Sequence, residues 1–478
     1  MMGRTIAAAG LTIALSALAV ASAKADLAIS SKPTENVSCA AGVCTATAKK
    51  AVLNVDDLTA ILASGDVAVS TGGIAKDIDV TAALSWASTS RLTLDADKSL
   101  VVKQPVTVAG SGALTLSSNS GRKSVDLEFF GKGHIAFWDL SSSLVINGKS
   151  YTLVGDIATL AADIAANPSG NFALAHDYDA SADGTYKSSP IPTSLEGTVD
   201  GLGNSISKLA IDSIEFGATG FFTLIAPGGT VRNLGIVRAS AYGNNYISFG
   251  LLAGDADGVI SRCWVTGTMR AARGDDAGGL AGFNSGVIFE AYADVKLSAR
   301  SSIDQNIGGL VGRNTGTIST AHSLGSVKAG QTQTDLVGGL VGLNQGLIEN
   351  TFARNSMLAS NNQCCSVYFG GLVGKNDSGG QIQTSYAAGQ ISKNDSSILG
   401  GLVGFDGSAP GNIANSYWDL DLGVSDPSQG AGNVANDSGI TGLTTAQFLS
   451  GLPAGFDPKI WRQDSKTNAG FPFLLDFP

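Results

Sequence analysis

A short apolar block framed by glycines recurs six times between Gly250 and Gly404. Five of the six copies read GGLAG or GGLVG, and the spacings between their central leucines are 29, 30, 30, 32 and 30 residues. These leucines are Leu251, Leu280, Leu310, Leu340, Leu372 and Leu402. A fixed period of this length is typical of a solenoid, in which each repeat packs only against its neighbours. Because a solenoid has no single central pocket, we expect function to lie on a long lateral surface.

The segment before these repeats alternates apolar and polar residues in short runs, for example at Leu92/Leu94 and Leu114/Leu116. Alternation with a period of two predicts β-strands, and Gly, Asp, Ser or Asn between the runs predicts turns. The pattern returns after 22 residues, from Ile78 to Leu100, which suits a coil of three short strands. The 62 glycines and the low charged fraction of 15% also favour stacked strands over helical bundles. We therefore predict an all-β chain folded as a parallel β-helix.

Two features of the repeat receive a structural interpretation. The repeat glycines are expected to supply permissive φ angles and room for close stacking, and the following Asn-x-Gly, as in Asn284-Ser285-Gly286, is expected to supply turns with positive φ. Twelve residues after four of the repeat leucines stand Cys263, Tyr292, His322 and Phe352, and Tyr386 and Tyr417 follow their leucines by 14 and 15 residues. We interpret this column as a stacking ladder.

Three short helices are expected in addition. One covers Val55 to Ala63 with Asn54 or Asp56 as N-cap, an amphipathic one covers Tyr151 to Ala166, and a third begins at Thr444 or Thr445. The resulting organisation is a signal peptide (1–25), a cysteine-containing segment (26–50), N-terminal β-helix coils (51–148), a helix and loop insertion (149–195), the repeat β-helix (196–418) and a C-terminal capping segment (419–478).

The first 25 residues are predicted to direct export. Arg4 precedes an apolar stretch from Ile6 to Val20, and small-x-small cleavage sites end at Ala23 and Ala25. The stretch is shorter than the roughly 20 residues that span a bilayer, and no later segment is apolar enough to span one. Export permits disulfides, so we expect Cys39 and Cys44 to pair across a small loop.

The three other cysteines are Cys263 and the adjacent Cys364 and Cys365. Adjacent cysteines cannot easily bond to each other, and an odd number leaves one thiol over, whose identity stays open. No histidine lies near any cysteine, which disfavours a metal site, and we expect no cofactor.

The net charge of −10 and the lack of a Lys/Arg cluster argue against nucleic acid as a partner. Candidate carboxylates for catalysis or Ca²⁺ binding are Asp255/Asp257, Asp275/Asp276 and Asp419/Asp421/Asp426, although the first two pairs fall in expected turns, where Asp is common. The third set lacks the spacing and terminal Glu of an EF-hand. His134, His176 and His322 have no Ser or Cys neighbour in a nucleophile motif. We therefore assign no catalytic, cofactor-binding or metal residue.

The repeated GGLVGxNxGxI resembles the GLUG motif of bacterial surface and secreted proteins related to filamentous haemagglutinins. The upstream segment from Leu195 to Ile211 and the ending from Tyr417 to Leu475 are similar to the segments that flank such repeats. The resemblance implies a right-handed parallel β-helix on an exported, adhesin-like protein. The chain lacks the N-terminal secretion segment of two-partner exoproteins and an autotransporter barrel, so periplasmic residence stays an alternative to secretion or the cell surface.

Two functional hypotheses follow. The first is a non-enzymatic, exported solenoid that binds host or bacterial cell-surface or matrix polymers along its lateral face. The second is a polysaccharide lyase or glycoside hydrolase, since β-helices host such enzymes and would then bring several Asp, Glu or Arg side chains together in a groove. A purely structural stalk differs from the first only in lacking a ligand. The oligomeric state is not predicted.

Overall fold

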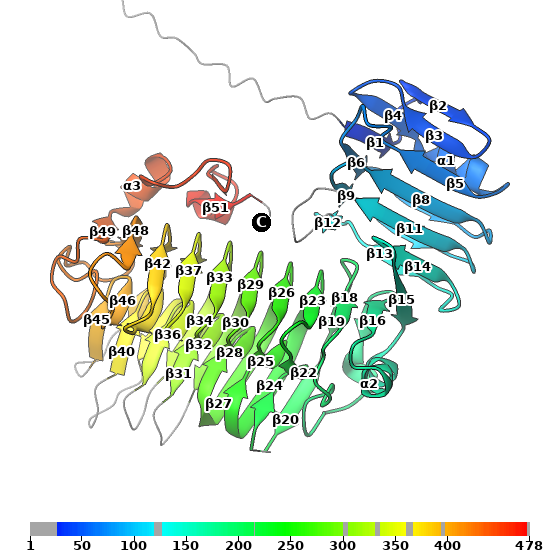
Figure 1. The fold of residues 1–478 in the computed structure, drawn as a ribbon. Helices are drawn as coiled ribbons and strands as arrows, with labels where there is room; N and C mark the ends of the chain where they lie inside the picture. Colours follow the sequence, from blue (N-terminus) through cyan, green and yellow to red (C-terminus); the bar gives the residue numbers. More distant parts are fainter. Residues whose placement is uncertain are drawn as a thin grey trace, which may run out of the picture.

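A computed structural model describes residues 26–118, 127–214, 216–299, 305–329, 335–359, 367–392 and 397–475. Strands make up 51% of the chain and helices 7%, and the strands wind into a β-solenoid, which confirms the predicted parallel β-helix with small helical additions. The predicted signal peptide, Cys364 and Cys365 lie outside the described residues. Figure 1 shows two stacks of strands, one formed by the N-terminal third of the chain and a longer one by the rest.

The shorter stack, here called the N-terminal solenoid, contains coils of three parallel strands. Ile78 pairs with Leu100 and Leu92 with Leu114, so equivalent side chains of successive coils lie above one another and fill the interior. The three coils consist of β6 (Asp77–Val80), β7 (Leu84–Trp86) and β8 (Arg91–Ala96); β9 (Leu100–Val102), β10 (Val106–Val108) and β11 (Ala113–Ser118); and β12 (Leu127–Phe129), β13 (Ile135–Phe137) and β14 (Ser143–Ile146).

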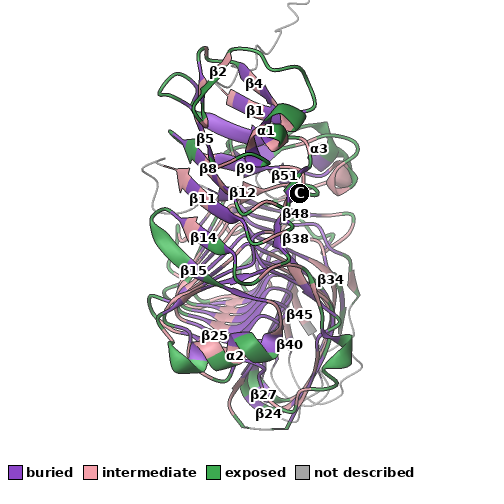
Figure 2. Cartoon of the chain, turned by 90° about the vertical axis from the view of Figure 1, so that its right-hand side faces the viewer, coloured by how far each residue is buried: buried purple, intermediate pink, exposed green. Residues whose placement is uncertain are grey.

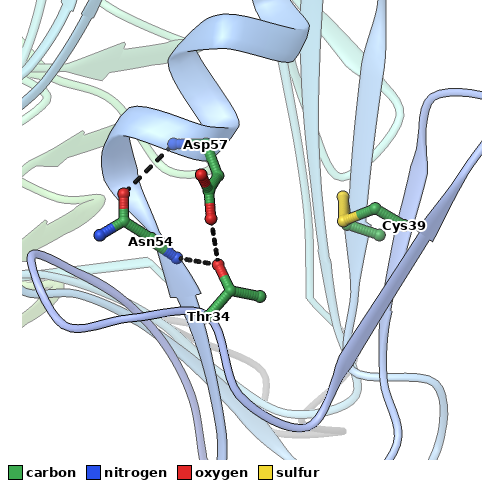
Figure 3. Close-up of a disulfide and its surroundings, with 5 residues drawn as sticks. Thr34, Cys39, Asn54 and Asp57 are labelled. Atoms are coloured by element: carbon green, nitrogen blue, oxygen red, sulfur yellow. Dashed lines mark hydrogen bonds between the residues drawn. A yellow bond between two sulfur atoms is a disulfide. The ribbon is translucent and has the colours of Figure 1, made fainter.

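The first end of this solenoid is covered by α1 (Val55–Leu62), which buries Leu58 and Leu62. The side chain of Asn54 accepts hydrogen bonds from the backbone N–H groups of Asp56 and Asp57, so Asn54 is the N-cap, one of the two predicted (Figure 3). The predicted Cys39–Cys44 disulfide is confirmed and joins two strands of a hairpin. The strands around α1 are β1 (Asp26–Ser30), β2 (Val37–Ala40), β3 (Val43–Ala46), β4 (Ala51–Asn54) and β5 (Val67–Ser70).

The chain reverses direction between the two stacks. β14 pairs antiparallel with β15 (Lys149–Val154) across Asn147-Gly148, whose φ angles of 48° and 76° suit a two-residue hairpin turn. The predicted helix from Tyr151 was therefore wrong in its first part, because Tyr151 pairs within the hairpin and Thr152 to Val154 pair in parallel with the following strand. α2 (Ile157–Ala166) begins after the N-cap Asp156.

The longer stack, here called the main solenoid, has three faces. Face 1 continues from β15 in one sheet through β16 (Asn171–Leu174), β18 (Thr198–Asp200), β23 (Thr230–Arg232), β26 (Val259–Ser261), β29 (Val287–Phe289), β33 (Thr317–Ser319), β37 (Leu347–Glu349), β42 (Gln381–Gln383) and β47 (Ile413–Ala414). Face 3 contains β22 (Phe222–Ile225), β25 (Ala253–Ala256), β28 (Ala281–Asn284), β32 (Val311–Asn314), β36 (Val341–Asn344), β41 (Val373–Asn376) and β46 (Val403–Asp406).

Face 2 is the widest of the three. Its strands are β17 (Tyr178–Asp179), β19 (Ser205–Ser207), β20 (Ala210–Ser213), β21 (Ala218–Thr219), β24 (Gly235–Phe249), β27 (Trp264–Gly278), β30 (Tyr292–Ala299), β31 (Asn306–Gly308), β34 (His322–Ala329), β35 (Leu336–Gly338), β38 (Phe352–Ala353), β39 (Ser356–Ala359), β40 (Val367–Gly370), β43 (Tyr386–Ala387), β44 (Ile391–Ser392), β45 (Ser397–Gly400), β48 (Ser416–Asp419) and β49 (Ile440–Leu443). Figure 2 shows the buried residues gathered inside the wound strands.

The expected insertion at 149–195 instead contributes to the first coils of the main solenoid. It contains β15, β16 and α2, and Ile191 and Leu195 form parallel bridges to Phe222 and Ile225. The buried side chains of α2, including Leu160 and Ile164, join the core of the main solenoid. Amphipathic packing of this helix against the solenoid is therefore confirmed, although the segment does not interrupt the coils.

The repeat glycines allow the backbones of neighbouring coils to approach closely, and they do not adopt the left-handed φ angles that favour glycine. None of the described glycines of the five GGLAG or GGLVG blocks has a left-handed φ. The expectation that these glycines supply permissive φ angles was therefore wrong. A Cβ on Gly309 would lie 2.1 Å from the carbonyl oxygen of Gly339, and one on Gly342 would lie 2.4 Å from the backbone nitrogen of Ile307. Both distances are too short for any side chain, so the stacking of coils excludes one here.

The Asn of each Asn-x-Gly forms a buried ladder, and the expected positive φ does not occur there. Nδ2 of Asn284 donates to Oδ1 of Asn314 at 2.7 Å, and the series continues through Asn344 and Asn376 at 2.8 Å per step. Left-handed φ angles of 45° to 52° lie instead at the corner between faces 1 and 2. The residues at this corner are Arg262, Glu290, Thr320, Asn350, Thr384 and Asn415.

The predicted ring ladder exists directly after this corner, with two corrections, one at Cys263 and one at Tyr417, whose ring packs edge-on against Phe456. Tyr292, His322, Phe352 and Tyr386 stack with ring centroids 4.5 to 5.2 Å apart. Tyr292 pairs in register with Trp264 and not with Cys263, because that coil has one more residue between its leucine and the column. A shift of one residue turns a strand side chain to the opposite face, so Cys263 lies in the core.

The C-terminal segment only partly follows the predicted end cap. β49 pairs with β48 and extends face 2 by one strand, and α3 (Thr445–Ser450) begins at the predicted N-cap Thr444 with a capping box to Gln447. Residues 445–475 then fold back along the side of the solenoid and cover the end of the ring ladder. There Tyr386 donates a hydrogen bond to the carbonyl of Pro472 at 2.6 Å. β50 (Trp461–Arg462) and β51 (Phe473–Leu474) form a small hairpin in this segment.

Candidate binding surface

The outer side of face 1 carries two columns of side chains in strict register. Strand pairing aligns the first residue of each strand with the first residue of the next, and the third with the third. The first column is Thr198, Thr230, Val259, Val287, Thr317, Leu347 and Gln381. The second column is Asp200, Arg232, Ser261, Phe289, Ser319, Glu349 and Gln383. The two columns thus contain hydroxyl, amide, charged and apolar side chains along the length of face 1.

A cleft of about 580 Å³ lies where this face meets the hairpin between the two solenoids. The hairpin contributes one side and the two columns contribute the floor. The lining residues are Ile146, Asn147, Lys149, Tyr151, Thr198, Thr230, Arg232, Val259, Ser261, Val287 and Phe289. This mixture of apolar surface with a few polar groups is common in ligand sites.

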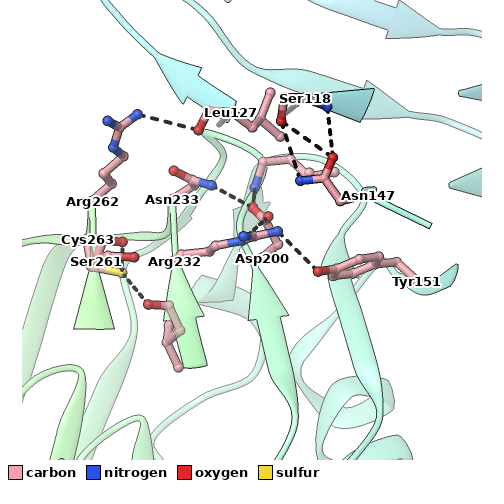
Figure 4. A network of polar contacts seen from close by, with 12 residues as sticks. Ser118, Leu127, Asn147, Tyr151, Asp200, Arg232, Asn233, Ser261, Arg262 and Cys263 are labelled. Atoms are coloured by element: carbon pink, nitrogen blue, oxygen red, sulfur yellow. Dashed lines mark hydrogen bonds and ion pairs between the residues drawn. The ribbon is translucent and has the colours of Figure 1, made fainter. Parts of the chain in front are cut away.

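A buried ion pair fixes the position of Arg232 in this cleft (Figure 4). Its Nε donates to Oδ2 of the fully buried Asp200 at 2.7 Å, and its Nη2 donates to the hydroxyl of Tyr151 at 3.1 Å. Asp200 also accepts from Nδ2 of Asn233 at 3.0 Å. Burial raises the pKa of Tyr151 above its usual range, so its hydroxyl stays protonated at neutral pH. Movement of the Arg232 guanidinium out of this position would leave the buried carboxylate of Asp200 without its counter-ion, which is unfavourable.

The main solenoid also closes the open end of the N-terminal solenoid. The backbone N–H groups of Ile135 and Phe137 donate to the carbonyls of Leu202 and Ala175 at 2.9 and 2.7 Å. Nδ2 of Asn204 donates to the carbonyl of Ile135 at 2.8 Å. Arg262 adds an ion pair to Glu128 at 3.4 Å from the corner of faces 1 and 2. These contacts hold the two stacks in a defined position and so define the cleft.

The carboxylates singled out in the sequence are spread over the molecule and serve local contacts. Asp255 and Asp257 accept hydrogen bonds from Ser248 and Ser285. Asp276 is buried against Arg313 at 2.9 Å, and burial raises its pKa, whereas its neighbour Asp275 points to solvent. The three groups do not line the cleft on face 1.

Asp419 and Asp421 fix the start of α3. Oδ2 of Asp419 accepts from the hydroxyl of Thr445 at 2.7 Å, and Oδ2 of Asp421 accepts from the backbone nitrogen of Thr445 at 2.8 Å. Asp426 forms a turn with Ser428. Among the residues that the structure describes, no group of three or more His, Cys, Asp or Glu side chains is arranged to hold a metal ion.

The three histidines each have their own local contacts. His134 contacts the carbonyl of Lys132, and the ring of His176 stacks on the exposed Trp138 with centroids 5.0 Å apart. His322 is in the ring ladder, where burial lowers its pKa to about 3. Cys263 is likewise buried, which raises the pKa of its thiol to about 12. Both groups are therefore uncharged at neutral pH.

A second hollow of about 770 Å³ lies within the C-terminal segment, between α3 and the hairpin around Trp461. None of the residues singled out in the sequence lines it. The cleft on face 1 was not predicted either, because its members come from strands more than 100 residues apart. The one local signal was Asn147-Gly148, a strong indicator of the hairpin that forms its side.

Fold and surface together define a β-solenoid protein with a long lateral face. No protein-family model matches the chain. The chain is 30% identical over 144 residues, 30% of its length, to Halomucin of Haloquadratum walsbyi, and it spans only 1% of that protein. A solved structure of a candidate immunoglobulin A1 protease from Bacteroides ovatus is similar with 18% identity and a TM-score of 0.42, over 69% of this chain and 93% of that one.

The structural likeness carries no argument about activity at this identity and score. In the described part of the chain, no helix has the length and apolar character needed to cross a membrane.

Proposed function

We propose that this chain is an exported, non-enzymatic β-helical protein that binds a cell-surface or matrix polymer along face 1. The observation that supports this proposal is the strict register of the two outer columns, which places side chains at the same two positions of each successive coil, one strand spacing apart. A polymer with repeating units meets such a surface with repeated contacts, whose effects combine as in multivalent binding. The resemblance to GLUG-repeat surface proteins and the partial likeness to Halomucin agree with an exported protein of this kind.

Binding to a panel of immobilised polysaccharides and matrix polymers tests the proposal. Leu347→Glu on face 1 is expected to weaken binding because it replaces a half-buried apolar side chain of the first column by a negative charge. Leu343→Glu is the matched control, since Leu343 is also half-buried and faces outward from face 3 of the same coil. Equal loss in the two variants would argue against face 1 as the binding surface.

Two further measurements separate the alternatives. Turnover of a polysaccharide that is lost in Asp275→Asn or Asp419→Asn would favour a lyase or hydrolase. Protease treatment of intact cells, followed by immunodetection, tests surface exposure. Protection that disappears only after the outer membrane is permeabilised would place the protein in the periplasm and overturn the adhesin-like proposal.

A further inference from the structure

The cleft between face 1 and the Asn147-Gly148 hairpin differs in charge from the rest of the molecule. The chain has 40 acidic and 30 basic residues, yet the described residues that line this cleft include Lys149 and Arg232 and no Asp or Glu. Asp200 compensates Arg232 from below, so Lys149 leaves the lining with one net positive charge. No ion pair of Lys149 with another described residue is present.

The cleft also has an apolar strip beside these cations. Val259, Val287 and Phe289 lie on neighbouring strands of the floor, and 38% of Val287 is exposed to solvent. Side chains of this kind pack against the C–H face of a sugar ring. Thr198 and Thr230 add hydroxyl groups in the adjoining column, and these can both donate and accept hydrogen bonds.

We propose that this cleft binds a carboxylate-bearing sugar unit of an acidic polysaccharide, with Lys149 and Arg232 recognising the carboxylate and Phe289 packing on the ring. This inference rests on the proposed function and names the ligand class of the same face. A neutral sugar would leave the ammonium of Lys149 without a charged partner, whereas a carboxylate forms charge-assisted hydrogen bonds with both cations. Arg232 is prearranged for this contact because Asp200 and Tyr151 already hold its guanidinium.

Binding of two carboxylated oligosaccharides and one uncharged oligosaccharide of equal length tests whether the cleft recognises a carboxylate. A galacturonic acid hexamer represents a plant-wall source, a hyaluronan hexamer represents an animal-matrix source, and the methyl ester of the galacturonic acid hexamer removes the charge with little change in shape. Binding is measured by titration calorimetry. Salt at about 0.15 M in the buffer screens the long-range repulsion between the acidic ligand and the acidic chain. At least one carboxylated hexamer is expected to bind, and the ester is expected to bind at least tenfold more weakly.

Lys149→Met is expected to weaken binding of the carboxylated hexamer about tenfold and to leave the ester unaffected. Lys296→Met is the matched control, because Lys296 is an exposed lysine on face 2. Phe289→Ala is expected to weaken binding of both the acid and the ester. Far-ultraviolet circular dichroism verifies that each variant keeps the fold, as the exposed position of Lys149 predicts.

Each other outcome has a definite meaning. Equal affinity for acid and ester, with no effect of Lys149→Met, overturns the acidic-sugar assignment and leaves polymer binding by face 1 intact. An equal effect of Lys149→Met and Lys296→Met shows nonspecific charge attraction and also overturns it. Absence of binding to the hexamers, while a neutral polymer from the larger panel binds and Leu347→Glu weakens that binding, refutes only the ligand class. Absence of binding to every polymer refutes the proposed function itself.

Discussion

The imidazole ring of His322 lies 4.5 Å from the phenyl ring of Phe352, with an angle of 4° between their planes. Tyr292 stacks on the other side of the same imidazole at 5.0 Å. The histidine therefore occupies an aromatic position of a stacked column, and its pKa is lowered to about 3 by burial. It contributes an uncharged ring, and protonation would place an unpaired charge in the ladder.

This position makes stability depend on pH. The unfolded chain binds a proton at His322 below about pH 6.5, whereas the folded chain does not until about pH 3, so the free energy of unfolding falls as pH decreases through this window. From pH 6.5 to 5 the loss from this residue is up to about 2 kcal/mol. His322→Phe removes this part of the slope in urea denaturation, and His134→Gln, at a half-exposed site, retains it. Parallel curves for wild type and His322→Phe would contradict the assignment.

Gly342→Ala is expected to destabilise the fold by about 2 to 4 kcal/mol, because the new methyl group would lie 2.4 Å from the backbone nitrogen of Ile307. Gly65→Ala is the control. A Cβ at Gly65 meets no atom within 4 Å, so its effect should stay within about 1 kcal/mol. Guanidinium denaturation measures both. Similar midpoints for the two variants would mean that the coils can separate to accept a side chain.

The asparagine ladder gives a second prediction about stability. Asn314→Ala leaves Nδ2 of Asn284 without its ladder acceptor and Oδ1 of Asn344 without its donor, which should cost about 2 to 4 kcal/mol. Asn284→Ala should cost less, because Asn284 begins the ladder and its Oδ1 has no hydrogen-bond partner among the residues that the structure describes. Thermal unfolding of the two variants decides the order. The reverse order would show that the ladder does not act through these bonds.

The C-terminal segment is expected to depend on Trp461. This residue is fully buried, lies 4.5 Å from the ring of Phe456, and donates from Nε1 to Oδ1 of Asn350 at 3.3 Å. Trp461→Ala should cost about 3 to 5 kcal/mol and open residues 445–475 to limited proteolysis, detected by mass spectrometry. Trp138→Ala, at a position 64% exposed, should leave cleavage unchanged. A protected segment in Trp461→Ala would contradict its proposed role.

The period of the repeat was sufficient to predict the stacking of coils, because every coil must present the same shape to the next one. It was not sufficient to predict the register of Cys263. In that coil Trp264 follows Leu251 by 13 positions, whereas Tyr292 follows Leu280 by 12, and only strand pairing shows which residue joins the column. The role of the Asn-x-Gly asparagines was also missed, since a side chain that bonds to the next coil leaves no local sequence signal.

The candidate site was beyond prediction for a related reason. Lys149, Arg232 and Phe289 are far apart in the sequence and meet only because the hairpin reverses the chain and the coils stack in register. The position of residues 445–475 depends equally on long-range packing, in which Phe448 and Trp461 cover Tyr386. Composition and periodicity are sufficient to predict the strands of each coil, but they do not predict which distant segments pack against its outer surface.

The corner between faces 1 and 2 takes part in the contacts of the main solenoid with both flanking parts, since Arg262 contacts Glu128 of the N-terminal solenoid and Asn350 contacts Trp461 of the C-terminal segment. Arg262 and Asn350 are separated along the corner by Glu290 and Thr320, so three strand spacings of about 4.8 Å each lie between them, about 14 Å in all. Loss or duplication of one repeat in a relative would change this separation by a single strand spacing and leave each attachment intact. The number of repeats thus determines the distance between the two contacts, and this distance can change during evolution only in steps of one strand spacing.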